Sequence, residues 1–342
     1  MAKTKLNKRL RKQLKRQLKL KKQANKEKSM KVVILSGSDW ANLGYNICES
    51  LKSVGVNAVS FKKNKHRFAY PRQSPIYKKN KNLLALINNA DIIQYMHSSI
   101  PKVGGNHRTK KRIVMHGGSK YRQNSSRINK VFNPIVDMTL IQTGDMLGLG
   151  AKNEKWLLPP INTNSIQPDY KFYGNKISPL FAHYPSSIKE KGTSTIIKML
   201  KKLGLSQNFK HSKVKVKWRN QIARMNQCDV YIEMFNMEQD GRTGSKVYGS
   251  WGMSCLEAAA LGKIVITNFL NIERYKLEYT DDCPLIICNT LKEFKASVKR
   301  LSKMNKQQIT NLKKLTRKWV EDYHSYQAVG NRLKGFYNEV LK

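Results

Sequence analysis

The sequence is poor in acidic residues, in paired cysteines and in long apolar runs. Asp and Glu number 22 against 65 Lys and Arg, so the 342-residue chain carries a formal net charge of +43. Its apolar runs are shorter than the roughly 18 to 20 residues that span a bilayer, and none follows the basic N-terminus, which argues against a membrane span and a secretory signal. The five cysteines form no CxxC pair, which favours reduced thiols and a cytoplasmic location. His and Cys residues form no metal-binding pattern, and we expect no metal site.

An excess of positive charge of this size points to a polyanionic partner, because such a field acts on binding and solubility rather than on fold. The candidates are nucleic acid, an anionic membrane surface and an acidic polymer, although an AT-rich genome would account for some of the lysines. Residues 1–30 form a basic tail in which leucines recur at every fourth position. This tail has three interpretations: a solvated tail, an arm that binds phosphates in a salt-dependent manner, and, less favoured, a membrane-surface helix.

Strand and helix patterns alternate along the rest of the chain and predict an α/β fold. Residues 31–36 have the pattern of a buried strand, and an amphipathic helix and a second strand at 56–61 follow. The order of elements predicts two Rossmann-like domains that face a central cleft, at residues 31–162 and 163–342. We expect the last helix to return to the first domain. Alternation at residues 214–218 predicts an edge strand.

The stretch 248–267 carries the strongest functional signal. A loop of small residues leads into an alanine-rich helix, which ends at Gly262 and precedes a β-branched strand at 264–266. A glycine-containing loop before a helix lets a ligand approach the backbone, and the helix N-terminus favours anionic groups. Glu257 lies within this apolar helix, where a carboxylate needs a partner such as the hydroxyl groups of a ribose. The alternative is a helix packed on a sheet with Glu257 facing solvent.

Residues 249–258 resemble the donor-site signature of the retaining GT-B glycosyltransferases of glycosyl transferase group 1, which reads E-G-F-G-x-x-x-x-E-A-x-A-x-G. The resemblance implies a GT-B fold and a donor site that includes Gly252, Met253, Ser254 and Glu257. It also implies that the Glu257 carboxylate binds the ribose of a nucleotide-sugar. The sequence departs from the signature at Gly249, where the family has a glutamate near the donor sugar.

Three further segments agree with this family in order and spacing, at residues 112–122, 157–162 and 180–193. Lys191, Gly192 and Thr193 open a predicted helix, where an ammonium group and free backbone N–H groups suit a diphosphate, and Lys191 matches the family's diphosphate-binding lysine. His116 follows a buried strand and precedes two glycines, and it matches the family's histidine beside the donor sugar. Each residue also has a plain structural interpretation, as an ordinary first-turn lysine and as a buried structural histidine.

Basic and aromatic residues are interleaved between residues 62 and 81. This composition suits a loop that holds phosphates and stacks on bases, and equally a solvated loop whose rings pack locally. We expect five side chains to bind the acceptor or nucleic acid: Lys62, Lys63, Arg67, Tyr121 and Arg122.

Together these features predict an enzyme that transfers a sugar from a nucleotide-sugar co-substrate, without a cofactor and with retained anomeric configuration. His116 is the candidate catalytic residue. The basic composition favours a nucleic-acid acceptor, namely a hydroxylated base in DNA such as that of a viral genome, which would place the protein in the host cytoplasm. Two alternatives stay open: glycosylation of an anionic membrane lipid or surface polysaccharide, and a non-catalytic nucleic-acid-binding protein on a transferase scaffold.

Overall fold

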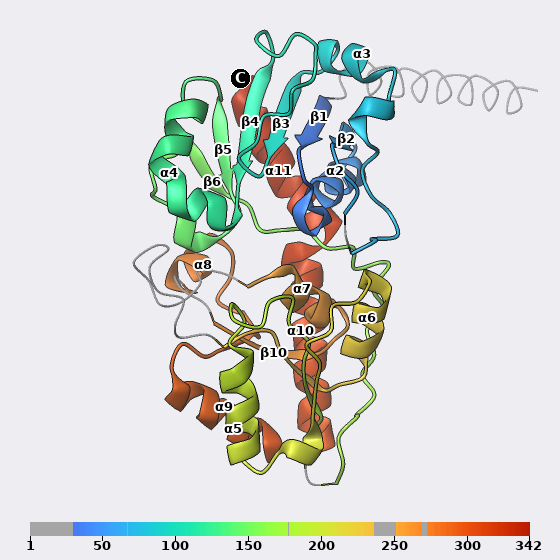
Figure 1. Cartoon of the computed structure of the whole chain (residues 1–342), viewed down its shortest axis with the longest axis vertical. Helices are drawn as coiled ribbons and strands as arrows, with labels where there is room; N and C mark the ends of the chain where they lie inside the picture. Colours follow the sequence, from blue (N-terminus) through green and yellow to red (C-terminus); the bar gives the residue numbers. More distant parts are fainter. Residues whose placement is uncertain (1–29, 67, 177, 236–250, 269–271) are drawn as a thin grey trace, which may run out of the picture.

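The computed structural model describes residues 30–66, 68–176, 178–235, 251–268 and 272–342. Two α/β domains lie one above the other along the long axis of the molecule (Figure 1). The basic tail, Arg67 and Gly249 lie outside the described residues, so the expectations placed on them stay predictions. Within the described part of the chain, each helix is too short or too polar to cross a membrane.

The first domain is built on a six-stranded parallel sheet with the strand order β2-β1-β3-β4-β5-β6. Its strands are β1 (Lys31–Ser36), β2 (Asn57–Lys62), β3 (Ile92–Met96), β4 (Lys111–His116), β5 (Met138–Ile141) and β6 (Glu154–Trp156). Its helices are α2 (Leu43–Ser53), α3 (Leu83–Asn88) and α4 (Gly118–Phe132), with short 3-10 helices η1 (Trp40–Asn42), η2 (Tyr77–Lys79) and η3 (Gly144–Met146). Apolar clusters cover both faces of the sheet, as a parallel sheet requires.

The second domain holds a five-stranded parallel sheet with the strand order β11-β10-β9-β7-β8. Its strands are β7 (Phe181–His183), β8 (Phe209–His211), β9 (Val230–Ile232), β10 (Ile264–Thr267) and β11 (Ile286–Ile287). Its helices are α5 (Thr193–Lys202), α6 (Trp218–Asn226), α7 (Met253–Ala260), α8 (Ile272–Glu278), α9 (Leu291–Ser302) and α10 (Lys306–His324), with the 3-10 helix η4 (Ser206–Asn208). The final helix is α11 (Tyr326–Leu341).

These two sheets confirm the α/β fold with two Rossmann-like domains. The strand predicted at 214–218 is wrong, because residues 212–217 have no regular structure and the edge strand is β8 instead. The valines that alternate with lysines in this segment do not form a buried face, since Val214 is 65% exposed. Trp218 begins helix α6, and it lies against the first domain as described below.

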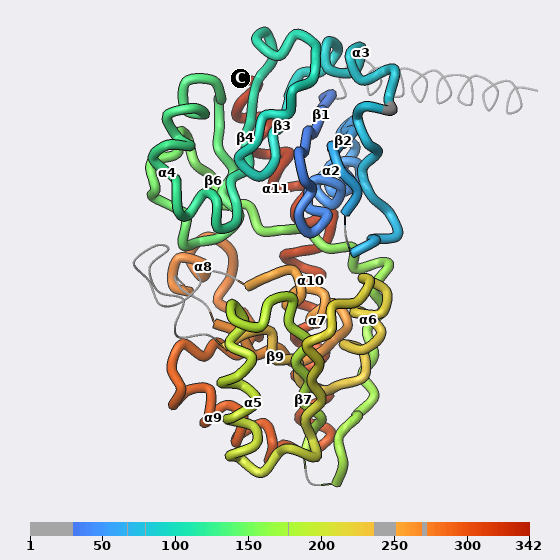
Figure 2. The backbone as a smooth tube through the Cα atoms, viewed as in Figure 1, coloured from blue at the N-terminus to red at the C-terminus, as the bar shows by residue number. Residues whose placement is uncertain are grey.

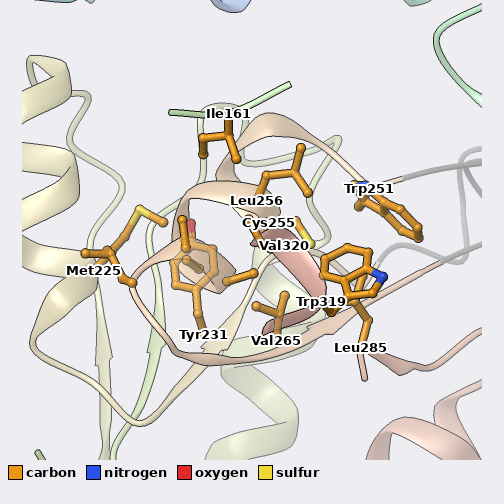
Figure 3. Packing of buried hydrophobic residues seen from close by; sticks show 14 of the residues in the cluster. Ile161, Met225, Tyr231, Trp251, Cys255, Leu256, Val265, Leu285, Trp319 and Val320 are labelled. Carbon is orange, nitrogen blue, oxygen red and sulfur yellow. The ribbon is translucent and has the colours of Figure 1, made fainter. Parts of the chain in front are cut away.

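Helix α7 is the central helix of the second domain and is buried almost throughout. Its small residues allow close packing, and Figure 3 shows Cys255 and Leu256 of this helix close to Trp319 and Val320 of α10. Gly262 follows the helix with a φ of +70°, a left-handed conformation that glycine adopts without strain. The chain then enters β10, so loop, helix, glycine and strand follow in the expected order.

The two C-terminal helices join the domains. Helix α10 packs within the second domain, and α11 crosses back to lie against α2 in the first, as the red segment of the tube in Figure 2 shows. At the junction between them, the Ile161 backbone N–H donates to the His324 carbonyl at 2.8 Å. The contact between α11 and α2 is very close at Gly330, where an added Cβ atom would lie 2.2 Å from the Ser50 carbonyl oxygen.

We expect Gly330→Ala to destabilise the protein, because its Cβ would meet backbone and force the two helices apart. Overpacking of this kind costs about 1–3 kcal/mol in the free energy of unfolding. Gly335→Ala on the same helix is the matched control, since its Cβ would meet no atom within 4 Å. The control should stabilise by roughly 0.5–1 kcal/mol, the difference in helix propensity. Urea denaturation checks both variants, and equal effects would contradict the packing argument.

Candidate functional site

A cavity of about 330 Å³ lies between the two domains and takes its walls from both. The first domain contributes Trp40, Phe68 and Tyr70, and the second contributes Lys191, Trp218 and Glu257. Two further hollows of about 510 and 630 Å³ adjoin it and share lining residues with it. The carboxyl ends of parallel strands are where α/β folds bind ligands, so this cleft is the candidate site.

Glu257 is held inside the cavity wall by helix α7. Its side chain is 6% exposed, and its Oε1 accepts a hydrogen bond from the Trp218 indole Nε1 at 2.7 Å. Burial raises the pKa of the Glu257 carboxyl to about 7, and the hydrogen bond from Trp218 opposes that shift. The alternative in which Glu257 faces solvent is therefore wrong. A buried carboxylate that borders a cavity is available to a hydroxyl-bearing ligand.

Lys191 reaches the same cavity from the segment before α5. Its Nζ forms an ion pair with Glu233 Oε1, and Thr267 Oγ1 donates to Glu233 Oε2 at 2.7 Å. Ser254 Oγ completes the group, 3.3 Å from Glu233 Oε1. The ammonium is thus fixed at the cavity wall by a fully buried carboxylate, while 15% of the Lys191 side chain stays accessible.

The remaining predicted donor residues divide into two groups. Gly252 and Met253 line the cavity, and a Cβ atom on Gly252 would lie 2.9 Å from Glu233 Oε1 and 3.2 Å from Lys191 Nζ. Glycine at this position therefore leaves room for the Lys191–Glu233 pair. Thr193 is buried, and its Oγ1 lies 2.9 Å from His183 Nε2, so its hydroxyl is directed into the domain core instead of the cavity.

His116, the candidate catalytic residue, does not reach the cleft surface. Its side chain is fully buried, its Nδ1 lies 2.9 Å from Ser98 Oγ, and its ring stacks on Tyr121 at 4.2 Å. Burial lowers the pKa of the His116 imidazole to about 3, so the ring is neutral. The same contacts bury Tyr121, whose hydroxyl donates to Asn129 Oδ1 at 3.1 Å. The position of His116 at the end of β4 therefore does not bring its side chain to the cleft surface, and its catalytic role stays a prediction.

The predicted acceptor residues differ in whether their charged groups are exposed. Lys62 is 1% exposed and bonds to Gln73, so it does not present its charge to a phosphate, and that expectation is corrected. Lys63 is exposed. Arg122 lines the 510 Å³ hollow, but its guanidinium is paired with Asp145.

Three rings of the segment 62–81, those of His66, Phe68 and Tyr70, pack locally and toward the second domain, whereas Tyr77 is buried in the core of the first domain. Tyr70 lies 5.8 Å from the Trp218 ring, and the His66 ring lies 4.9 Å from Tyr70 and 5.2 Å from Phe68. All four residues line the 330 Å³ cavity. The loop therefore contributes three of its rings to the cavity wall, while Lys63, Lys65, Lys78 and Lys81 are exposed to solvent.

The sequence motifs did not point to Glu233, Trp218, Asp39 or His97, which also lie at or beside the cleft. Asp39 is buried, accepts from the Gly44 N–H at 2.7 Å and lies 3.7 Å from His97 Nε2, and His97 lines the 510 Å³ hollow. His97 has a φ of +56°, a strained conformation that often occurs at functional sites. Glu233 and His97 each directly follow a buried strand, which is a signal the sequence did contain.

The described residues include no group of three or more His, Cys, Asp or Glu side chains that could hold a metal ion. The charged side chains that line the cavity include Lys191, Lys215, Arg224 and Glu257, and the buried Glu233 lies behind Lys191. Together they suit a ligand that carries both anionic groups and hydroxyl groups.

No protein-family model matches the sequence, and no curated protein does. The structure is similar to solved glycosyltransferase structures. Anabaena HepE, in complex with UDP and glucose, aligns over 91% of this chain and 100% of its own, with a TM-score of 0.57 and 10% identity. A glycosyltransferase from Rickettsia africae ESF-5 aligns over 92% and 99%, with a TM-score of 0.54 and 11% identity. AviGT4, a glycosyltransferase involved in avilamycin A biosynthesis, aligns over 91% and 98%, with a TM-score of 0.55 and 9% identity. These likenesses confirm the predicted GT-B fold.

The raised pKa of Glu257 predicts a pH dependence of stability. The folded protein holds this proton more tightly than the unfolded chain, so the contribution of Glu257 is present below about pH 4.5 and is lost as pH rises through about 7. A shift of this size corresponds to a loss on the order of 3 kcal/mol in the free energy of unfolding. The Glu257→Gln variant should not show this loss of stability as the pH rises. Urea denaturation at pH 5 and pH 8 measures the difference, and parallel pH profiles for the two proteins would contradict the assignment.

Proposed function

We propose that the protein is a glycosyltransferase that transfers a sugar from a nucleotide-sugar with retention of anomeric configuration. The observation that carries this proposal is a cavity that Lys191 and Glu257 both line and whose walls come from both domains. The fold shared with HepE, whose structure contains UDP and glucose, supports it. Retention is proposed from the resemblance of residues 249–258 to the retaining signature.

The donor fits the cavity by its charge pattern. The Lys191 ammonium and the N-terminus of α7 supply positive potential for the diphosphate, and Glu257 supplies acceptor oxygens for ribose hydroxyls. When the bond between the sugar and the diphosphate breaks, negative charge develops on the departing phosphate. Positive groups already in place at that point stabilise the transition state, and the proposal requires no cofactor.

For the acceptor, we propose a hydroxylated base in DNA. The formal net charge of +43 supports a polyanion. Lys120 and Arg127 of α4 line a hollow of about 500 Å³ in the first domain, and Lys120 also lines the 510 Å³ hollow of the cleft. A DNA strand whose phosphates contact Lys120 and Arg127 would place a base near the donor. The base would have to leave the duplex stack to enter the cleft.

The donor assignment is tested by the binding of UDP to the full chain. Glu257→Ala and Lys191→Ala should each weaken binding by about tenfold or more, because charge-assisted hydrogen bonds contribute roughly 1.5–3 kcal/mol. Lys198→Ala is the matched control for Lys191, since Lys198 is exposed on α5 and does not line the cavity. Isothermal titration calorimetry measures the affinities.

If the unmodified protein binds no nucleoside diphosphate in a panel that includes UDP, GDP and ADP, the transferase proposal fails. The non-catalytic nucleic-acid-binding alternative then takes its place. If all three variants bind as the unmodified protein does, the site lies elsewhere.

The acceptor assignment is tested by a transfer assay with labelled nucleotide-sugars and two acceptors, hydroxymethylated DNA and anionic lipid vesicles. The double variant Lys120→Ala and Arg127→Ala should raise the KM for DNA by about tenfold and reduce its salt dependence, because two phosphate contacts are lost. Lys130→Ala, which is exposed on α4 outside the hollow, is the control. NMR of the product reports the anomeric configuration. Transfer to vesicles but not to DNA would replace the acceptor by a lipid.

A further inference from the structure

We infer that the first domain supplies part of the nucleobase pocket, through an interdomain aromatic cluster formed by Phe68, Tyr70 and Trp218. The inference rests on the proposed function and names the class of ligand group involved, the base of a nucleoside diphosphate. Phe68 and Tyr70 belong to the first domain, and Trp218 belongs to the second. The nucleotide would then be held between the domains and not by the second domain alone.

The cluster is anchored by a backbone hydrogen bond across the cleft. Trp218 is the first residue of α6, and its backbone N–H donates to the Phe68 carbonyl at 2.8 Å. The first N–H groups of a helix have no partner within the helix, so one from outside must satisfy them. Here the first domain provides that partner, and the contact fixes the end of α6 to the loop that carries Phe68 and Tyr70.

The Trp218 side chain connects this contact to the proposed ribose site. Its indole N–H donates to Glu257 Oε1 at 2.7 Å. That bond orients the carboxylate and leaves Oε2 as the oxygen for ribose hydroxyls. A nucleobase bonded to that ribose lies within a few ångströms of Glu257, which is where the rings of the cluster are.

The walls beside Glu257 are aromatic. The Tyr70 and Trp218 rings have centroids 5.8 Å apart and an interplanar angle of 42°, and on the second-domain side the Arg224 guanidinium lies 4.6 Å over the Tyr184 ring. All of these side chains line the 330 Å³ cavity together with Glu257. Every base offers a flat face, so rings at this position bind a base by stacking.

The arrangement has a mechanical consequence. A movement that separates the domains would break the bond between Trp218 and Phe68 and remove Tyr70 from the pocket. Nucleotide affinity is therefore tied to the closed arrangement of the domains, and first-domain residues far from the signature helix contribute to donor binding.

The test is UDP binding to the full chain by isothermal titration calorimetry, with substitutions in the first domain. Tyr70→Ala should weaken binding about tenfold, the effect of removing one stacking ring. Tyr70→Phe keeps the ring and should bind within about twofold of the unmodified protein, the variation expected when stacking is retained. Leu84→Ala is the control, since this first-domain side chain is 53% exposed on α3 and does not line the cavity. Thermal denaturation confirms that each variant is folded.

Unchanged UDP affinity in Tyr70→Ala, with the unmodified protein binding UDP, would overturn the inference and leave the proposed function intact. Failure of the unmodified protein to bind any nucleoside diphosphate would overturn both. Tryptophan fluorescence gives a second measurement on the same proteins. UDP should change the emission of the unmodified protein, and Trp218→Phe should lose most of that change. A full response in Trp218→Phe would place the base away from the cluster.

Discussion

The buried guanidinium of Arg317 fixes the arrangement on which the cleft depends. It donates to the carbonyl oxygens of Ile166 and Ala260, each at 2.6 Å, and to that of Thr163 at 2.8 Å. One side chain of α10 thus fastens the segment that leaves the first domain to the end of α7, the helix that carries Glu257. A guanidinium group is planar and always charged, so it can donate to several carbonyl oxygens at once. Helix α10 continues into α11, which packs on α2, so the segment that carries Arg317 also connects the second domain to the first.

The two cavity residues Lys191 and Glu257 each have a partner within the protein. Lys191 is paired with Glu233, and Glu257 accepts from the Trp218 indole. Burying unpaired charge is costly, so these partners allow a polar pocket to exist inside a folded protein. They also set a condition on any ligand, which must offer interactions at least as favourable as those it displaces. A molecule with both phosphate and ribose groups meets that condition at both points.

Sequence patterns predicted the fold, and they pointed to Lys191 and Glu257, which both line the cavity. Lys191 precedes a helix and Glu257 lies within one, and backbone periodicity places both near the ends of the second sheet. The patterns were wrong for Lys62 and Tyr121, and they did not reveal the burial of His116. Their burial depends on how side chains pack in the folded domain, where Lys62 bonds to Gln73, Tyr121 to Asn129 and His116 to Ser98, and backbone periodicity does not report such packing. The alternation at 214–218 predicts a strand for Trp218, which instead begins α6 and bonds through its backbone to Phe68 of the other domain.

The return of α11 to the first domain has a consequence for synthesis. The side of the first sheet that holds Ile47 and Leu51 is completed by Leu333 and Tyr337, which follow the whole second domain in the sequence. The first domain therefore keeps an uncovered apolar face until the second domain has been synthesised, the kind of surface that chaperones bind.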